Sequence, residues 1–476
     1  MNTGDGIVYV ADQDSTVTKM NLSGTGKLVV NEIRFGQHGD ATMNMSGNSV
    51  MEAKTFCMGY SYDDTHSVNT SITLKENATL KAEKFYMAYG QGSKTNAVNA
   101  TLTLLGDSKM EVSGDFIPFR GFHANGHTGK ACATLVMDDN ASLTTGNFWG
   151  GSNNANNYAA PADGNEYAAY YTFSGNSKLS VAEWWVAMSA KSYVLIEENA
   201  EITSRNGNSG LAWSAGANGS LLEMTGGKLT VPNFYISNGS NHAATMNQSG
   251  GLVNFGTLKM TSPNADLNIS DDAVMKVDTT ADNGGEIAVS GGDLQIKTLN
   301  NNAGGRIQVS GGDLYATTIN NVGTMKVTDA GRVQVGTIGA TTGETLTISG
   351  ANAISMNGDF VLDIFSLTDF DKLNVAEGST LDFGTEAGLV LSIAKEAGFS
   401  NTEGYVIDNW ITSFDDLNVL QSLNLSVEGA NDFVAFMNAN GGIVFGNANA
   451  VPEPASIILL LLGVFGLVAV RKSTRK

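Results

Sequence analysis

The chain has 476 residues, with 47 acidic and 27 basic side chains, and its formal net charge is −20. Removing the four cations of the last six residues leaves −24 for residues 1–470, which argues against nucleic acid and anionic lipid as partners. Hydrophobic residues make up 42%, too many for a disordered chain. With 56 glycines, 6 prolines and 16% charged residues, the composition favours extended, turn-rich β-structure.

The first six residues, Met1 to Gly6, have neither a basic segment nor an apolar stretch of the kind that forms an export signal. The C-terminal tail described below calls for such a signal. We therefore expect the start of the sequence to be truncated or misassigned.

An internal repeat is the main feature of the body. The segment 284–294 recurs 20 residues later as 304–314, and looser copies contain two alternating apolar residues, a short turn and a second alternating strand. The apolar pairs are Met43/Met45, Ile72/Leu74, Leu102/Leu104, Leu135/Met137, Tyr171/Phe173, Val194/Ile196, Leu222/Met224, Leu267/Ile269, Ile287/Val289, Ile307/Val309, Met325/Val327 and Leu346/Ile348.

The copies are spaced about 30 residues apart in the first half, with an excursion near 138–170, and about 20 apart from Leu267 onward. This spacing predicts an all-β solenoid, a right-handed parallel β-helix over residues 1–357 with three short strands per coil. Tandem β-sandwiches are the alternative, but they need about 100 residues per unit. The 20-residue period also stacks Asn300 on Asn320 and Asn301 on Asn321, which predicts an amide ladder.

Aromatic residues follow the strand pairs in the first half, within residues 56–60, 85–90, 116–119, 148–151, 184–188 and 234–236. Stacked coils would align them as a stripe. The stripe has two interpretations, a sugar-binding platform or the filling of a wide core. Because neighbouring residues of a strand face opposite ways, each aromatic doublet sends one ring outward. The candidate glycan contacts are Tyr86, Trp149, Trp184, Trp185 and Tyr235.

Signals for catalysis, metal or cofactor are weak, and we expect none of the three. His123 and His127 lie in a glycine-rich segment without the glutamate of a zinc helix. The Gly-Gly-Asp segments at 291–293 and 311–313 lack the frame of calcium-binding nonapeptides. Cys57 and Cys132 occupy different points of the repeat, which favours two buried free thiols over a disulfide.

From residue 358 the strands lengthen. Asp371 to Val375 reads Asp-Lys-Leu-Asn-Val and precedes Tyr405 to Asp408, a pattern that resembles the C-terminal β-helical region of autotransporter passengers. This resemblance implies a β-helical body. We assign residues 358–441 the role of a β cap on the open end of the solenoid, and residues 442–450 that of a flexible tether.

The tail, residues 451–476, combines three parts. Val451, Pro452, Glu453 and Pro454 precede an uncharged apolar run, 455–470, and a basic end that starts with Arg471 and Lys472. The run is at the lower limit for a membrane-spanning helix, and the cations after it predict a cytoplasmic C-terminus with the body across the membrane. A buried core helix is the alternative, but it would hardly end in a cationic hexapeptide.

This tail resembles the PEP-CTERM sorting signal of bacteria. The resemblance implies that a membrane protease of the exosortase type reads Pro452 to Pro454 and removes a transient inner-membrane anchor, which releases the body to the cell surface or the medium. Three functions therefore stay open. They are an exported, non-enzymatic surface or matrix protein with a structural or adhesive role, a polysaccharide-binding protein that uses the outward aromatic rings, and a β-helix polysaccharide lyase.

Overall fold

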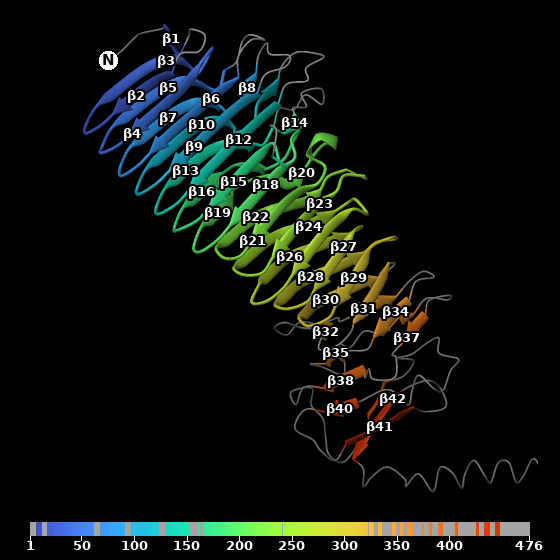
Figure 1. The fold of residues 1–476 in the computed structure, drawn as a ribbon. Coiled ribbons are helices and arrows are strands. Elements are labelled where there is room, and N and C mark those ends of the chain that lie inside the picture. Colours follow the sequence, from blue (N-terminus) through green and yellow to red (C-terminus); the bar gives the residue numbers. More distant parts are fainter. Residues whose placement is uncertain are drawn as a thin grey trace, which may run out of the picture.

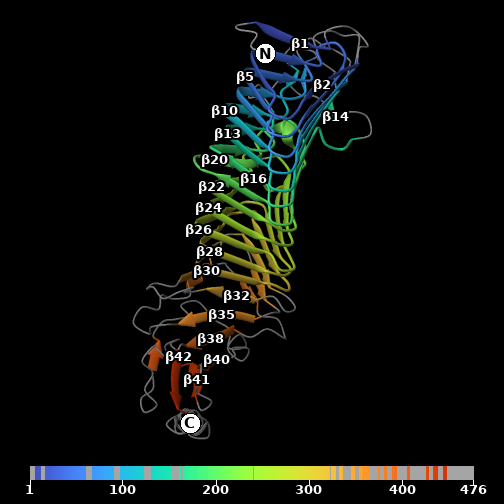
Figure 2. The same cartoon turned by 90° about the vertical axis from the view of Figure 1, so that its left-hand side faces the viewer.

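The computed structural model describes residues 6–327, except 12–16, 61–66, 91–96, 123–129, 152–159, 162–164, 240 and 322, and beyond them only strands between 332 and 447. The strands stack one after another along a single axis in the order of the sequence (Figures 1 and 2). The described part is all-β apart from one short 3-10 helix, η1 (Ala215–Ala217).

Two parallel sheets run the length of the stack. The long sheet consists of β1 (Ile7–Val10), β3 (Lys27–Phe35), β5 (Val50–Met58), β7 (Thr79–Tyr86), β10 (Lys109–Ile117), β13 (Ser142–Trp149), β16 (Lys178–Val181), β17 (Glu183–Trp185), β19 (Glu201–Ser204), β20 (Asn208–Ala212), β22 (Lys228–Ser237), β24 (Leu252–Met260), β26 (Val274–Asn283), β28 (Asp293–Asn301), β30 (Asp313–Asn321), β32 (Arg332–Val335), β33 (Thr345–Ile348), β35 (Asp359–Ile364), β36 (Asn374–Val375), β38 (Leu389–Ile393) and β40 (Leu425–Val427).

The second sheet faces it. It consists of β2 (Val17–Leu22), β4 (Asp40–Met45), β6 (Val68–Leu74), β9 (Ala97–Leu104), β12 (Lys130–Met137), β14 (Ala160–Pro161), β15 (Ala169–Phe173), β18 (Ser192–Ile196), β21 (Ser220–Met224), β23 (Ala244–Gln248), β25 (Ala265–Ile269), β27 (Glu286–Val289), β29 (Arg306–Val309), β31 (Thr324–Val327), β34 (Ala353–Met356) and β37 (Thr380–Asp382). A small sheet pairs β8 (Tyr89–Gly90) with β11 (Gly121–Phe122).

Each coil visits the long sheet and then the second sheet, as a parallel β-helix does. The long-sheet strand bends in the middle. In β3, Leu28 and Val30 are buried, both Asn31 and Glu32 lie partly exposed, and Ile33 is buried again. The doubled outward step breaks the alternation, so each coil presents two strand segments in the long sheet and one in the second sheet. The predicted parallel stack is confirmed. Three short strands per coil are not general, because in most coils the long-sheet strand is continuous, as β3 is, and only some coils split it, as into β16 and β17. The right-handed sense stays a prediction.

The predicted apolar pairs form the inner face of the second sheet. Met43 pairs in register with Ile72, and Ile72 with Leu102, and all three are fully buried. The last pair was wrong. Leu346 lies in the long sheet against Ile319, and the partner of Met325 in the second sheet is Ile354. The pattern predicted the pair but not its sheet, because both sheets of a coil alternate alike.

The sequence pattern also missed one coil of the second sheet. There, Met246 stacks between Leu222 and Leu267, and Gln248 occupies the position that other coils fill with an apolar residue. Gln248 is buried, and its side-chain nitrogen donates to the carbonyls of Gly250, Gly251 and Val274 at 3.3, 3.2 and 3.1 Å. A buried amide with backbone partners is tolerated where a sequence pattern expects a hydrophobic residue.

Six successive turns between second-sheet and long-sheet strands alternate glycine and acid at one left-handed position, namely Gly47, Glu76, Gly106, Asp139, Gly175 and Glu198. In three turns the acidic side chain reaches back to the preceding coil and accepts a hydrogen bond from a glycine N–H. The pairs are Glu76 with Gly47, Asp139 with Gly106 and Glu198 with Gly175, at 2.6, 2.9 and 2.8 Å. A Cβ at Gly106 would lie 2.9 Å from the backbone nitrogen of Glu76, so the coil above each acid needs glycine.

The predicted amide ladder is confirmed. Asn300 and Asn301 pair in register with Asn320 and Asn321, and the Asn320 amide donates to Asn300 at 2.8 Å. The stack extends one coil further than expected, because Asn283 donates to Asn301 at 2.8 Å. Asn283 and Asn301 are fully buried, so they form an inner row of the ladder.

Parallel pairing crosses residue 358, because β32 pairs with β35 and the long sheet continues to β40. After it, β39 (Tyr405–Ile407), β42 (Ile443–Asn447) and β41 (Phe433–Met437) form an antiparallel sheet. The domain limits at 357, 441 and 450 and the capping role stay predictions. Among the described residues no helix is both long and apolar enough to span a membrane, and the run 455–470 lies outside them.

Candidate functional site: the outer face of the long sheet

The inward members of the aromatic doublets form one column inside the solenoid. Phe85 stacks on Phe56 with ring centroids 4.7 Å apart, and Phe116 lies 5.5 Å from Phe85 and 5.3 Å from Phe148. The column continues in register to Trp184, and further along the solenoid Phe234 stacks on Phe255 at 4.6 Å. These rings are fully buried, so they fill the wide core of the 30-residue coils.

Trp184 was wrongly predicted as a glycan contact. Its exposed fraction is 0%, and its ring belongs to the inner column, 6.3 Å from Phe234. In the doublet Trp184-Trp185 the strand register places the first ring inside, as in the other three doublets. Alternation requires one ring on each side, but only the register against Phe148 decides which.

The outward members also lie in one column, but the extent to which other side chains cover their rings differs along this column. Tyr86, Trp149 and Tyr235 are half-buried. Trp185 faces outward and is nevertheless only 3% exposed, because Trp213 packs edge-on against it at 4.4 Å and Tyr235 lies 5.7 Å away. Gly210 makes room, since a Cβ there would lie 2.6 Å from the Trp185 ring. Trp185 therefore does not present a free ring face, and its role as a contact is corrected.

At the N-terminal end the outward column carries a tyrosine–arginine cluster, which we define as Arg34, Tyr60, Tyr86, Tyr89 and Arg120. The Arg34 guanidinium lies 4.7 Å from the Tyr60 ring, and Arg120 lies 5.5 Å from Tyr86. The Tyr89 ring is 5.1 Å from Tyr60 and 5.8 Å from Tyr86. Cation–π stacking of this kind ties loops to the sheet. Neither arginine was predicted, because nothing in their spacing marks them.

The tyrosine–arginine cluster closes over Cys57, which faces outward in register with Arg34 and Tyr86 yet is 3% exposed. Burial raises the pKa of the Cys57 thiol to about 12, and burial also raises the pKa of Tyr60 to about 12. Cys132 lies on the second sheet, and both cysteines are free as predicted, but only Cys57 is buried, whereas Cys132 is partly exposed. The cluster is thus a small second core outside the sheet, and little of its ring surface is open to a ligand.

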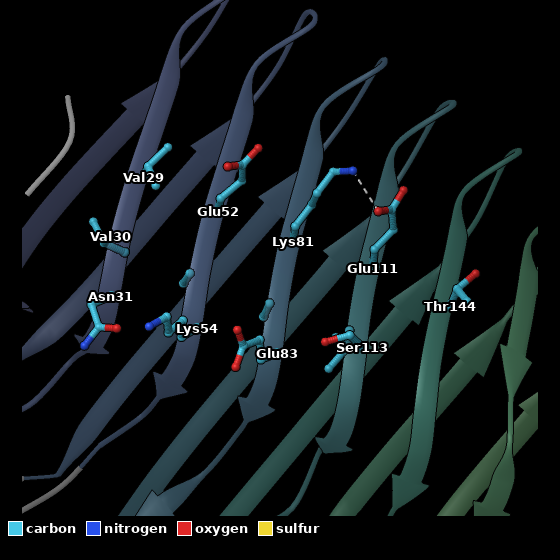
Figure 3. A pocket seen from close by; sticks show the side chains of 13 residues that line it. Val29, Val30, Asn31, Glu52, Lys54, Lys81, Glu83, Glu111, Ser113 and Thr144 are labelled. Carbon is cyan, nitrogen blue, oxygen red and sulfur yellow. Dashed lines mark ion pairs between the residues drawn. The ribbon is translucent and has the colours of Figure 1, made fainter. Parts of the chain in front are cut away.

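A groove opens on the same outer face. Its lining residues come earlier in each long-sheet strand than the outward aromatic residues. It crosses β3, β5, β7, β10 and β13 and encloses about 720 Å³. Figure 3 shows two rows of side chains that run across the strands. One row is Val29, Glu52, Lys81, Glu111 and Thr144, the other is Asn31, Lys54, Glu83 and Ser113, and the floor between them is Val30, Ala53, Ala82 and Val112.

The two rows are consecutive outward positions of each long-sheet strand, such as Val29 and Asn31 of β3, and the inward residue between them, here Val30, leaves the hollow. The charges in the first row alternate along the solenoid. Lys81 and Glu111 form an ion pair at 2.8 Å, and Glu52 pairs with Lys27 at 2.9 Å. The hydrogen bond to Glu111 raises the pKa of Lys81, so its ammonium group is charged at neutral pH. The groove was not predicted, since the sequence pattern does not reveal where two rows of outward side chains leave a hollow between them.

In the described part of the chain, no three side chains of His, Cys, Asp or Glu gather as a metal site would need. His123 and His127 lie outside it, as do Val451 to Pro454, Arg471 and Lys472.

Comparison with known proteins identifies the tail. Residues 450–476 match the PEP-CTERM protein-sorting motif. No curated protein and no solved structure matches the chain. The motif indicates an exported protein that an exosortase processes at the membrane, and the body that precedes it is a solenoid of parallel strands.

Proposed function

We propose that the protein is a non-enzymatic structural or adhesive component of the cell surface or the extracellular matrix. In this proposal its C-terminal tail anchors it briefly in the inner membrane, with the C-terminus in the cytoplasm. An exosortase-type protease then cuts near Pro452 to Pro454 and frees the body.

One observation carries the proposal, namely a continuous parallel stack of coils joined to a sorting motif. The backbone groups of each coil bond to the next coil, and the side chains add ladders such as Asp107 to Asn140 and Asn140 to Asn176, both at 3.1 Å. Such a stack is stiff along its axis and suits a spacer outside the cell.

Mass spectrometry of the C-terminal peptide tests the proposal. The protein is isolated from its native cells, separately from the membrane fraction and from the surface or medium. We expect the surface form to end near Pro452 to Pro454 and to lack residues 455–476. An intact Lys476 in a protein that stays in the membrane fraction would make the tail a permanent anchor and contradict processing.

A second candidate function is polysaccharide binding. The structure favours it less at the aromatic column than the sequence did, because Trp184 and Trp185 are buried. Trp213 and Tyr9 are the most open rings among the described residues, with exposed fractions of 42% and 43%. Loss of glycan affinity in Trp149→Ala plus Trp213→Ala would support the column, and unchanged affinity would exclude it. Release of unsaturated product from a polysaccharide panel would reveal a lyase activity.

A further inference from the structure

We propose that the groove across β3, β5, β7, β10 and β13 binds a linear, uncharged polysaccharide that lies along the solenoid axis. The inference deepens the second candidate function, because it names the site and the ligand class, and it leaves export and processing untouched.

The shape of the groove calls for an elongated ligand. Its lining comes from five successive coils, in two parallel rows at the regular spacing of parallel strands (Figure 3). Its volume, about 720 Å³, falls in the range of ligand sites, about 300–1,000 Å³. Because the groove is open along the axis, a chain longer than the groove can run out at both ends.

The backbone excludes an added peptide strand as the occupant. The strands beneath the groove pair with neighbours on both sides, for example β5 with β3 and β7. Their N–H and C=O groups are therefore used in the parallel ladder. The occupant must cross the strands and can meet only side chains and the small residues of the floor.

The charges of the groove select an uncharged chain. Three carboxylates and two ammonium groups line it, and they alternate within each row, Glu52 to Lys81 to Glu111 and Lys54 to Glu83. The carboxylates would repel a polyanion, and the ammonium groups would repel a polycation. The groove therefore offers neither of them an attractive field of one sign. A polyol gains from both kinds of group, since its hydroxyls donate to carboxylates and accept from ammonium groups.

The floor is low and carries no charge. Val30, Ala53, Ala82 and Val112 turn their side chains into the buried core, so they separate the two polar rows without rising between them. A sugar ring can lie flat on this strip while its hydroxyl edges reach the rows. The layout thus matches a chain that is apolar on its faces and polar at its edges.

Isothermal titration calorimetry of the full-length protein tests this inference. The probes are linear β-linked hexamers of glucose and of N-acetylglucosamine, a hexamer of mannose, and a hexuronate as the charged counterpart. We expect a neutral hexamer to bind with an affinity that is the same, within about twofold, at low salt and at about 150 mM salt, because no net charge is neutralised.

The decisive variant is Lys54→Ala with Glu83→Ala, both exposed in the free protein, so that folding is preserved. We expect at least about a tenfold loss of affinity, or about 1.4 kcal/mol. Ser113→Trp, which fills the groove from an exposed position, should abolish binding. The matched control is Lys276→Ala with Asp278→Ala, an exposed outward pair with the same two charge types on β26, outside the groove, and it should bind as the wild type does.

Three results would refute the proposal that the polysaccharide binds in the groove. They are unchanged affinity in both groove variants, a loss in Trp149→Ala plus Trp213→Ala equal to that in the groove variants, and salt-sensitive binding of the hexuronate alone. The second result would leave polysaccharide binding standing at the aromatic column. Binding of no hexamer by the wild type would refute the groove and the second candidate function together, whereas the C-terminal processing measured by mass spectrometry would be unaffected.

Discussion

The early coils and the late coils of the solenoid fill the same position of the core with different side chains. The inner column of the early coils is Phe56, Phe85, Phe116 and Phe148, and the same column in the late coils is Leu258, Ala281, Leu299 and Ile319. The early coils of β5, β7, β10 and β13 connect the long sheet to the second sheet through segments of nine or more residues, such as that between Met58 and Val68, whereas β26 ends at Asn283 and β27 begins at Glu286.

The difference teaches where extra residues go in a parallel solenoid. The ladder itself is unchanged, since both halves pair strand on strand in register. The added residues of the early coils enlarge the core and build an outer layer, the tyrosine–arginine cluster. The late coils are too short for such an outer layer, and the buried side chains of Asn283 and Asn301 close their turns instead. Four predictions test this contrast.

The largest effect is expected in the ring column. Phe116→Ala should destabilise the protein by about 3–5 kcal/mol, because the ring is fully buried between Phe85 and Phe148 and the wide coil cannot collapse around the gap. Urea denaturation followed by tryptophan fluorescence measures the change. Leu299→Ala in the late coils is the control, and it should cost less because a leucine side chain leaves a smaller void than a phenylalanine ring. Equal costs would mean that the two cores are packed alike.

The buried amide row comes next. Asn301→Ala should cost about 2 kcal/mol, since the Asn283 amide and the Thr324 carbonyl lose their partners at 2.8 and 3.0 Å inside the core. Asn300→Ala removes a neighbouring amide that is only partly buried, so water replaces it and the cost should stay below about 0.5 kcal/mol. Hydrogen exchange of residues 283–306 locates the loss. Similar exchange rates in both variants would contradict the role of the inner row.

The alternation of acid and glycine in the turns gives a smaller effect. Gly106→Ala should cost about 1–2 kcal/mol, because a left-handed residue there brings its Cβ against the Glu76 backbone. Gly24→Ala is the matched control, since Gly24 is also left-handed but its Cβ would meet nothing within 4 Å. Thermal unfolding compares the two. A larger loss at Gly24 than at Gly106 would show that contact between coils does not select the glycine.

The smallest effect is a loss of stability at alkaline pH, and it is absent at neutral pH. Burial raises the pKa of Cys57 from 9.0 to about 12 and that of Tyr60 from 10.0 to about 12, so the unfolded chain loses these protons first. The stability they contribute is complete below pH 9.0 and is lost as the pH rises to about 12. Urea midpoints at pH 8 and pH 11 should therefore fall more in the wild type than in Cys57→Ala with Tyr60→Phe. A parallel fall in both proteins would assign the loss elsewhere.

Much of the fold was predictable from the sequence, for a local reason. Two alternating apolar residues followed by a turn can hide their side chains only by stacking on a like neighbour, and a 20-residue period fixes which residues stack. The Asn300–Asn320 contact follows from that period alone. The sorting motif was also readable, because its three parts act in order along the chain and need no tertiary partner.

The site was less predictable. Alternation fixes that the two rings of a doublet face opposite ways but not which one faces inward, so Trp184 and Trp185 were both named and both are buried. Whether an outward ring stays open depends on what folds over it, and Trp213 is 28 residues from Trp185 in the sequence. The same holds for Leu346, whose sheet is decided by its pairing with Ile319.

The sequence by itself thus determined that this protein is exported and that its body is a stack of parallel coils, since both depend on order and period along the chain. Only the tertiary structure decided which rings are covered, where Cys57 is enclosed and where the groove opens. These features arise from side chains that residues of different coils bring together, and the gap between two outward residues of one strand becomes a groove only when neighbouring strands leave a gap at the same place.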